Sequence, residues 1–476
     1  MTFRLNGQEI PGMVSGNYQA VNSVLLNPSA PLHSKPWLDI NILGLALYAE
    51  NTAFYIPGEN FSWYNLLNPN YELAKFGKYE RPYLLNPGPR LYNFYMSERL
   101  LLPGFQYTDH NYSFGLQLSV RSAASGRRIP YEMLNFVYYD LAYPPQQFVE
   151  YTDYDIQSTA LNWAEIGLNY GRTIKYERFT IINAGITIKK ILATGGAYVN
   201  IDNLRYMVEN DSTVDIRNLS AEFGLSAPID YNTNEYDNKL GPFTGSGFGL
   251  DLGITYIRTS REIRRMNSED RPCDWRFIPY DYRLGISIVD WGYASFSGNA
   301  QVHTFNNVRH YWDRIDTIKF STINDALHEI SNRFYGDPNR SLSANSFSMG
   351  LPAALSVQFD YHLRDNWYVN TTWVQGIPAP AGVQVRRTPW LAATPRYETD
   401  YFELNIPVSL YDYRAPRLGL SFRVMGFTIG TDKLGTMLGM GDFYGMDIYF
   451  SARFSLLKGH CPEADESTPC GRLDFH

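Results

Sequence analysis

Residues 401–411 alternate apolar and polar side chains with a period of two, and few folds can use such a segment. The apolar members are Phe402, Leu404, Ile406, Val408 and Leu410. The polar residues Glu403, Asn405 and Ser409 stand between them. Successive side chains of a β-strand point to opposite sides, so this period predicts a strand with one apolar and one polar face.

The same alternation recurs along the chain. For a single hairpin, a soluble β-sandwich is the simpler interpretation, because the apolar face can pack on a partner sheet. Repetition favours a transmembrane β-barrel, in which strands of ~9–11 residues or slightly more turn polar side chains to the lumen. The predicted strands are residues 37–48, 91–102, 111–122, 159–170, 179–192, 247–257, 282–290, 293–305, 353–363, 367–377, 401–411, 418–424 and 446–456.

One or two further strands are expected within residues 197–227. The predicted fold is therefore all-β, an antiparallel transmembrane barrel of about fourteen strands, with about sixteen as the alternative. Short links belong in the periplasm and long links outside, which assigns 364–366 and 412–416 to the periplasm and 378–399 and 430–444 to the exterior. Pro407 predicts a bulge or a missing ladder bond within its strand.

Composition agrees with a barrel. The mean hydropathy of the 476 residues is −0.31, and no apolar run approaches the ~18 residues that a spanning helix needs. Aromatic residues make up 15% of the chain, which suits the girdles at the two membrane interfaces. The net charge of −7 argues against a nucleic-acid partner, and the pairs Arg264-Arg265 and Arg386-Arg387 are expected to be solvated loop charges.

Three regions are expected: an arm or plug at 1–35, the barrel at 36–456, and a periplasmic tail at 457–476. No signal peptide is recognisable at the start, so an exported barrel with this sequence is expected to be a mature or trimmed chain. Helical spacing predicts two short helices in loops, at 129–141 and 323–335. Thr322 with Asp325 can cap the second helix and Gly336 can end it.

No catalytic motif is present. The eight histidines lack the spacing of a helical zinc site, and the glycine-rich stretch 245–249 leads into a strand, whereas a phosphate cradle needs a helix there. The sequence therefore predicts no enzyme activity, no cofactor and no metal. In an oxidising periplasm Cys461 and Cys470 are candidates for a local disulfide, with a metal site that includes His460 as the weaker alternative, and Cys273 remains a free thiol.

Five charged side chains are predicted to face the lumen: Arg121, Asp360, Arg423, Asp447 and Arg453. They could line a solute path, or they could hydrogen-bond across a filled interior and stabilise the barrel. We favour the second interpretation, because a plug is expected.

Several segments together resemble a largely uncharacterised outer-membrane barrel family of Bacteroidota, which is similar in turn to fatty-acid-transporter-like barrels and to barrels associated with type IX secretion and gliding. The segments are Gly16-Asn17-Tyr18, Leu26-Asn27-Pro28-Ser29, and residues 247–256, 283–292, 351–376, 394–398 and 427–434. The resemblance implies a location in the bacterial outer membrane and an N-terminal segment folded into the lumen near Asn27 and Pro28. It supplies no catalytic motif.

Two functions are considered. The preferred hypothesis is a non-enzymatic subunit of a multiprotein envelope complex for protein secretion or outer-membrane protein assembly, because loops exceed what a minimal pore needs. Its partners would be outer-membrane lipid, other barrels and lipoproteins, and no nucleic acid. The alternative is a fatty-acid-transporter-like channel for hydrophobic or small solutes.

Overall fold

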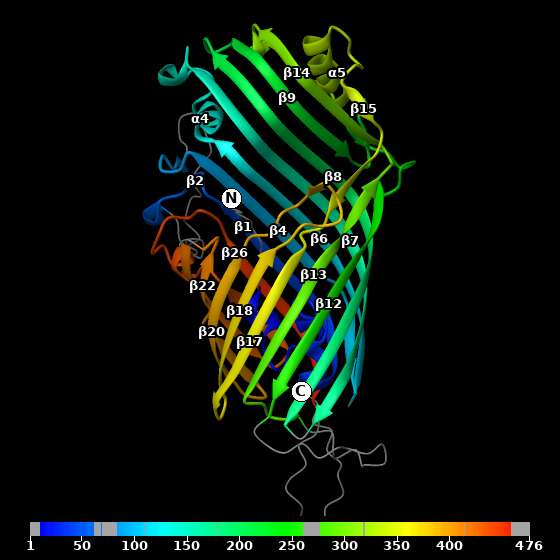
Figure 1. The fold of residues 1–476 in the computed structure, drawn as a ribbon. Coiled ribbons are helices and arrows are strands. Elements are labelled where there is room, and N and C mark those ends of the chain that lie inside the picture. The colour runs from blue at the N-terminus through cyan, green and yellow to red at the C-terminus, as the bar shows by residue number, and fades with distance from the viewer. Residues whose placement is uncertain are drawn as a thin grey trace, which may run out of the picture.

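The structure, a computed structural model, describes residues 10–60, 68, 83–109, 111–177, 179–259, 277–317, 319–413 and 415–457. Its main sheet is a closed antiparallel barrel (Figure 1). The barrel closes between β1 (Pro36–Asn51) and β26 (Asp447–Leu457), which pair from Pro36 opposite Leu457 to Tyr48 opposite Asp447. The all-β barrel is therefore confirmed, and both ends of its wall lie at the same rim.

Fourteen wall strands form the barrel, as predicted, and several consist of collinear segments separated by a bulge or a loop. Between β1 and β26 they are, in chain order, β4 with β5 (Leu91–Leu101, Gly104–Thr108), β6 (Tyr112–Pro130), β7 (Glu150–Glu177), β8 (Thr180–Val208), β9 with β12 (Val214–Ser226, Gly245–Arg258), β13 with β14 (Tyr282–Phe296, Ala300–Trp312), β15, β16 and β17 (Leu342–Ala344, Phe347–Gly350, Ala354–Arg364), β18 (Trp367–Gly376), β20 (Trp390–Glu398), β21 with β22 (Phe402–Asn405, Val408–Tyr411), β23 with β24 (Ala415–Leu418, Leu420–Val424) and β25 (Phe427–Thr431).

Two of these strands lie where loops were predicted. β20 contains Pro395 and the small residues Ala392 and Ala393, so its apolar alternation is weak, and β25 has only 5 residues. Tyr411 pairs with the first residue of β20, whereas the N–H of Glu398, its last residue, donates to the carbonyl of Asn366. The turns at 364–366 and 412–416 therefore lie at opposite ends, and the periplasmic assignment of 412–416 is wrong.

The prediction that residues 282–290 and 293–305 are two paired strands is wrong. β13 runs without a turn through Asp290, where a β-bulge opposite Leu250–Leu252 shifts the register. The bulge reverses which residues face inward, and this change of phase mimics a strand boundary in the sequence. At Pro407 the strand is interrupted between β21 and β22, which agrees with the expected break in the ladder.

The wall is uneven in height. β7 and β8 have 28 and 29 residues, whereas β18 and β20 have 10 and 9. About ten tilted residues suffice to cross the apolar layer. The external ends of β6 to β9 and β14 therefore continue beyond the membrane as a curved sheet (Figure 1).

Two helices lie at this external end, α4 (Tyr131–Tyr139) and α5 (Ile323–Tyr335) (Figure 1). α5 has the predicted bounds: Thr322 Oγ1 accepts a hydrogen bond from the Asp325 N–H at 3.1 Å, and Gly336 ends the helix with φ 72°. The other short elements are β2 (Phe54–Tyr55), β3 (Leu84–Leu85), β10 (Ile229–Asp230), β11 (Glu235–Tyr236), β19 (Val383–Gln384), α6 (Leu434–Met437), η2 (Gly58–Asn60), η3 (Pro144–Gln146) and η5 (Ile315–Thr317).

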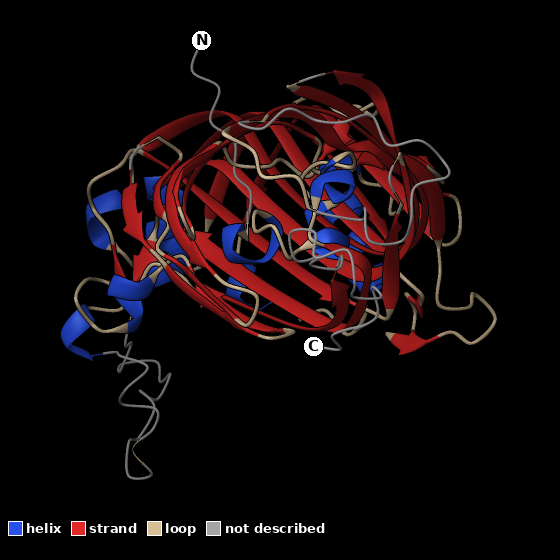
Figure 2. Cartoon of the chain, turned by 90° about the horizontal axis from the view of Figure 1, so that it is seen from below, coloured by secondary structure: helices blue, strands red, loops and turns tan. Residues whose placement is uncertain are grey.

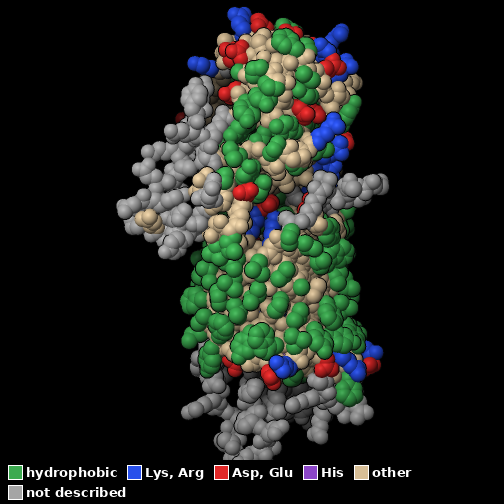
Figure 3. Space-filling model, turned by 90° about the vertical axis from the view of Figure 1, so that its left-hand side faces the viewer, with side chains coloured by type: hydrophobic (Ala, Val, Ile, Leu, Met, Phe, Trp, Pro, Cys, Tyr) green, Lys and Arg blue, Asp and Glu red, His purple; other side chains and the backbone are tan. Residues whose placement is uncertain are grey.

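Side chains of the wall alternate between a lipid-facing and a lumen-facing side. In β7 the outward Ile166 and Leu168 are 41% and 61% exposed, while Glu165 and Asn169 are buried inside. On the face that Figure 3 shows, apolar side chains cover the lower part of the barrel as a band, with charged side chains at its lower rim. A closed barrel with such a belt and a polar interior belongs in the bacterial outer membrane, as predicted.

No helix in the described ranges is long and apolar enough to span a bilayer.

Residues 10–35 lie inside the barrel (Figure 2). This segment, called the plug below, contains the helical turns α1 (Pro11–Val14), α2 (Ala20–Ser23) and η1 (Ala30–His33). Nearly all of its described side chains are buried, including polar ones such as Asn17, Gln19 and Asn22. The plug therefore fills much of the polar lumen.

Candidate solute path through the barrel

Asn27, Pro28 and Ser29 attach the plug to the tall side of the wall. Asn27 Nδ2 donates to Gln358 Oε1 at 3.0 Å, and the hydroxyls of Ser29 and Thr255 are 2.7 Å apart. Asn169 Nδ2 donates to the carbonyl of Pro28 at 3.1 Å. The Asn27 side chain also accepts the Ser29 N–H at 3.0 Å, which fixes the shape of the turn. Hydrogen bonds therefore position this turn.

Three inward-facing glycines, the glycine seat, receive the same turn: Gly185, Gly253 and Gly285. Gly185 of β8 pairs directly with Gly253 of β12. A Cβ atom on Gly185 would lie 2.3 Å from the Pro28 carbonyl oxygen, and one on Gly253 would lie 2.1 Å from Asn27 Oδ1. Because these distances are too short for any side chain, only glycine lets the plug approach the wall this closely.

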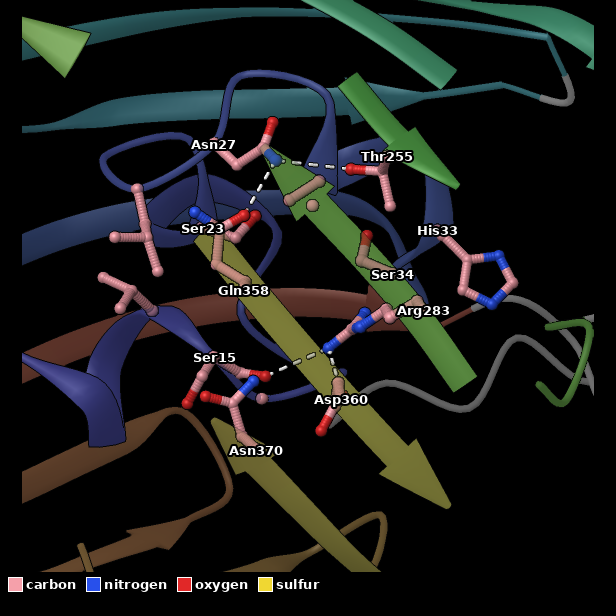
Figure 4. A pocket seen from close by; sticks show the side chains of 15 residues that line it. Ser15, Ser23, Asn27, His33, Ser34, Thr255, Arg283, Gln358, Asp360 and Asn370 are labelled. Carbon is pink, nitrogen blue, oxygen red and sulfur yellow. Dashed lines mark hydrogen bonds and ion pairs between the residues drawn. The ribbon is translucent and has the colours of Figure 1, made fainter. Parts of the chain in front are cut away.

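A second group of contacts joins the plug to the wall near the periplasmic end. Asp360 accepts from Arg396 at 3.1 Å and pairs with Arg283 at 2.8 Å. Both guanidinium groups also donate to the carbonyl oxygen of Ser15 in the plug, at 3.1 Å from Arg283 and 2.9 Å from Arg396. Figure 4 shows Arg283 between Ser15 and Asp360.

The short side of the wall holds the plug in the same way. Arg453 donates to the Tyr18 carbonyl at 2.8 Å and to Asp39 Oδ2 at 2.9 Å. Asp39 Oδ2 in turn accepts the N–H of Val21 at 2.9 Å. Arg423 pairs with Glu403 at 3.0 Å and lies over the ring of Tyr18. Wall residues on these strands therefore contact the plug directly.

Asp290 is the centre of a buried cluster above the plug. Its backbone has φ 56° at the bulge, and its N–H donates to Asp251 Oδ1 at 2.7 Å. Four cations lie within 3.8 Å of its carboxylate: Arg121, Lys189, Arg387 and Arg99. Glu165 accepts from Arg121 at 3.2 Å, and Asp251 pairs with Lys189 at 2.7 Å. The upper charge cluster, formed by these seven residues, thus has one more cation than carboxylates.

Two cavities flank the plug. Most residues that line the lower cavity are polar or charged, among them Asn27, Thr255, Arg283, Gln358 and Asp360 (Figure 4). The lining of the upper cavity combines apolar and cationic side chains: Ile10, Val14, Leu25, Leu26, Ala46, Tyr95, Ser97, Arg99, Arg121, Pro352 and Arg387. Val14 and Leu26 line both cavities and therefore lie between them.

The five residues predicted to face the lumen are all buried on the inner side of the wall. They do not form one site. Arg121 belongs to the upper charge cluster and Asp360 to the lower cavity, while Arg423 and Arg453 contact the plug. Asp447 accepts the N–H of Asp432 at 3.2 Å, at the external end of the short wall.

The prediction of a solvated Arg386-Arg387 pair is wrong for Arg387, which is 5% exposed and contacts Asp290 at 3.4 Å. Asp290, Arg387 and Arg99 are among the functional candidates that the sequence did not reveal. Arg264, Arg265, Cys273, Cys461 and Cys470 lie outside the described residues, so the proposed disulfide stays a prediction. Within the described ranges no group of three metal-ligating side chains is present.

Residues 48–432 match the model of a "Family of unknown function (DUF5723)". The chain belongs to this family. The match of DUF5723 covers most of the barrel wall. Among curated proteins, none matches the chain.

Solved barrels resemble this DUF5723 chain at low identity. The Ralstonia pickettii toluene transporter TbuX has 10% identity and a TM-score of 0.40, covering 96% of this chain and 100% of its own. The Pseudomonas putida toluene transporter TodX has 8% identity and a TM-score of 0.32, covering 95% and 98%. A Pseudomonas aeruginosa FadL homologue has 12% identity and a TM-score of 0.25, covering 95% and 98%.

Proposed function

We propose that the protein is an outer-membrane channel for small solutes with an apolar part, and that movement of the plug opens it. The observation that carries the proposal is the pair of cavities that share Val14 and Leu26 in their linings. A solute could pass from the upper to the lower cavity once these two side chains separate. An apolar constriction of this kind also excludes water and ions while it is closed.

The contacts of the turn at Asn27 and Ser29 support such a movement of this part of the plug. They are hydrogen bonds between neutral groups, and each contributes only about 0.5–1.5 kcal/mol net, less than the bonds that the guanidinium groups of Arg283 and Arg396 donate to Ser15. The wall is held by long continuous ladders, such as the one between β7 and β8. A shift of the plug therefore need not disturb the barrel.

The upper cavity suggests the kind of solute. Ile10, Val14 and Leu25 offer an apolar surface, and Arg99 with Arg387 offers positive charge beside it. Small-molecule sites commonly combine an apolar lining with a few polar groups that orient the ligand. A hydrophobic body with a polar or anionic end fits this lining.

Conductance in planar bilayers tests the proposal. Replacing both barrier residues, Val14→Ala with Leu26→Ala, should increase the open probability or the conductance by roughly threefold or more, since the apolar constriction widens. Val137→Ala is the matched control, because Val137 is 67% exposed on α4 and should leave conductance unchanged. Wild-type protein and double variant that both conduct no better than a protein-free bilayer would contradict the channel.

A subunit of a multiprotein envelope complex for secretion or barrel assembly is the second candidate. Exposed apolar side chains at the external end support it, with Val137 at 67% and Phe148 at 72% exposure. The expected partners, other barrels and lipoproteins, remain predictions, as does a relationship to Bacteroidota barrels of type IX secretion. Recovery of stoichiometric partners from gently solubilised outer membranes would support this role, and a purely monomeric barrel would count against it.

A further inference from the structure

The inner face of β6 carries arginines at two heights. Arg121, Ala123, Ser125 and Arg127 occupy alternate positions of the strand. Arg121 pairs across the ladder with Arg99 at the upper cavity. Arg127 lies six positions further toward the external end, roughly 20 Å along the strand. It is well above Val120, the last large exposed apolar residue of β6, and so lies outside the membrane belt.

The link between β18 and β20 brings a second arginine to this height. Its Val385 is fully buried and donates its N–H to the carbonyl of Gly350 at 3.3 Å. The N–H of Arg386 donates to Ser125 Oγ at 3.4 Å, and the side chain of Arg387 reaches Asp290. Of these two adjacent residues, Arg386 therefore lies beside β6 near Arg127, while Arg387 reaches the upper charge cluster.

Within the described ranges Arg127 and Arg386, the two external arginines, lack a carboxylate partner such as the one that Asp290 provides for Arg121 and Arg387 below them. In the part of the chain that the structure describes, no carboxylate forms an ion pair with Arg127 or Arg386, and Arg127 Nε is buried without a hydrogen-bond partner. Burial and the neighbouring Arg128 lower the pKa of Arg127, and burial and Arg127 lower the pKa of Arg386. Asp155 acts on Arg127 in the opposite sense, but its ion pair is with Arg128, at 3.9 Å.

We infer that Arg127 and Arg386 bind the anionic group, a carboxylate or a phosphate, of a solute that enters the upper cavity. Guanidinium groups match both anions with forked donors, and an anion between two like charges removes their repulsion. The same group can then exchange to Arg387 and Arg99 below, while Ile10 and the other apolar side chains accept the body of the solute. This inference rests on the proposed function, which brings the solute to this place.

Calorimetric titration of the purified full chain in detergent tests the inference with three probes of one shape. Benzoate carries a carboxylate, phenyl phosphate carries a phosphate, and benzyl alcohol is neutral. At least one anion should bind about tenfold more tightly than benzyl alcohol, and the double variant Arg127→Gln with Arg386→Gln should lose this preference. The anion that binds more tightly identifies the head group.

Arg128→Gln is the matched control, because Arg128 is the next residue of the same strand but contacts Tyr154 and Asp155. It should change anion affinity by less than about twofold. Arg127→Lys with Arg386→Lys keeps the charge and should retain most of the preference, which separates binding from misfolding. Wild-type protein that binds neither anion better than benzyl alcohol, or a glutamine variant that keeps the preference, would overturn the inference. Since binding is measured without transport, a barrel that binds anions but never conducts would contradict only the channel.

Discussion

At the scale of single residues, the bulge in β13 has the clearest chemical role. It turns the Asp290 carboxylate into the lumen, where four cations from β4, β6, β8 and the link before β20 converge on it. Bulges commonly re-aim a side chain at the cost of a locally broken ladder. Here the bulge places a carboxylate where it can bind cations from several different strands of the wall.

Asp290→Asn should therefore destabilise the barrel by about 3 kcal/mol, because several buried cations lose their shared counter-ion. Asp313→Asn serves as control, since the Asp313 side chain is 58% exposed in a surface pair with Arg314 and such pairs contribute little. Thermal unfolding in detergent measures both variants. Equal midpoints for Asp290→Asn and the wild-type chain would show that the upper charge cluster does not stabilise the fold.

The sequence predicts well which side of the wall a side chain faces, but it predicts poorly which residue that side chain contacts. Period-two alternation places Arg121, Arg423 and Arg453 toward the lumen, where the structure has them. The contact of Arg121 with Asp290 joins residues 169 positions apart, and that of Arg387 with Asp290 joins residues 97 apart. Neither contact leaves a local signal, so the upper charge cluster could not be predicted.

At the scale of elements, the glycine seat determines how closely the plug approaches the wall. Gly185→Ala should displace the turn at Pro28, because the new Cβ would meet backbone 2.3 Å away. The test uses Ser29→Cys in a background with Cys273, Cys461 and Cys470 replaced by serine. Adding Gly185→Ala to this background should make the new cysteine react with a maleimide roughly tenfold faster than it does without Gly185→Ala, since local opening exposes it.

Gly167→Ala is the matched control for this labelling. Gly167 faces the lumen from β7, but an added Cβ would meet its nearest neighbour, Thr187 Cγ2, at an ordinary 3.4 Å. Labelling at Ser29→Cys should stay at the slow rate of the parent. Equal labelling rates in the Gly185→Ala and Gly167→Ala backgrounds would contradict the claim that the glycine seat determines how closely the plug approaches the wall.

The count of fourteen strands agrees with the sequence through compensating errors. The alternation missed β20 and β25, one weakly patterned and one short. It also predicted two strands where β13 and β14 form one wall strand, with the boundary placed near the bulge. Finally, it counted a strand in 197–227 and another at 247–257, although β9 and β12 are parts of one wall strand that pairs with β8. Periodicity thus predicts the architecture, while bulges and small residues decide the boundaries.

At the scale of the whole molecule, a rigid wall encloses a plug that polar contacts hold in place. The tall side, with β7 and β8, extends beyond the membrane and carries the glycine seat lower on its inner face. The constriction at Val14 and Leu26 belongs entirely to the plug, so opening the proposed channel requires the plug and not the wall to move.

A disulfide between plug and wall tests this requirement most directly. The hydroxyl oxygens of Ser29 and Thr255 are 2.7 Å apart, so Ser29→Cys with Thr255→Cys should form a disulfide after small adjustments in the cysteine-free background. Single-channel recordings of the double and single variants are compared before and after reduction. If the plug must move, the oxidised double variant should be silent and regain conductance when reduced, with both single variants active throughout. Full conductance in the oxidised double variant would contradict movement of the plug.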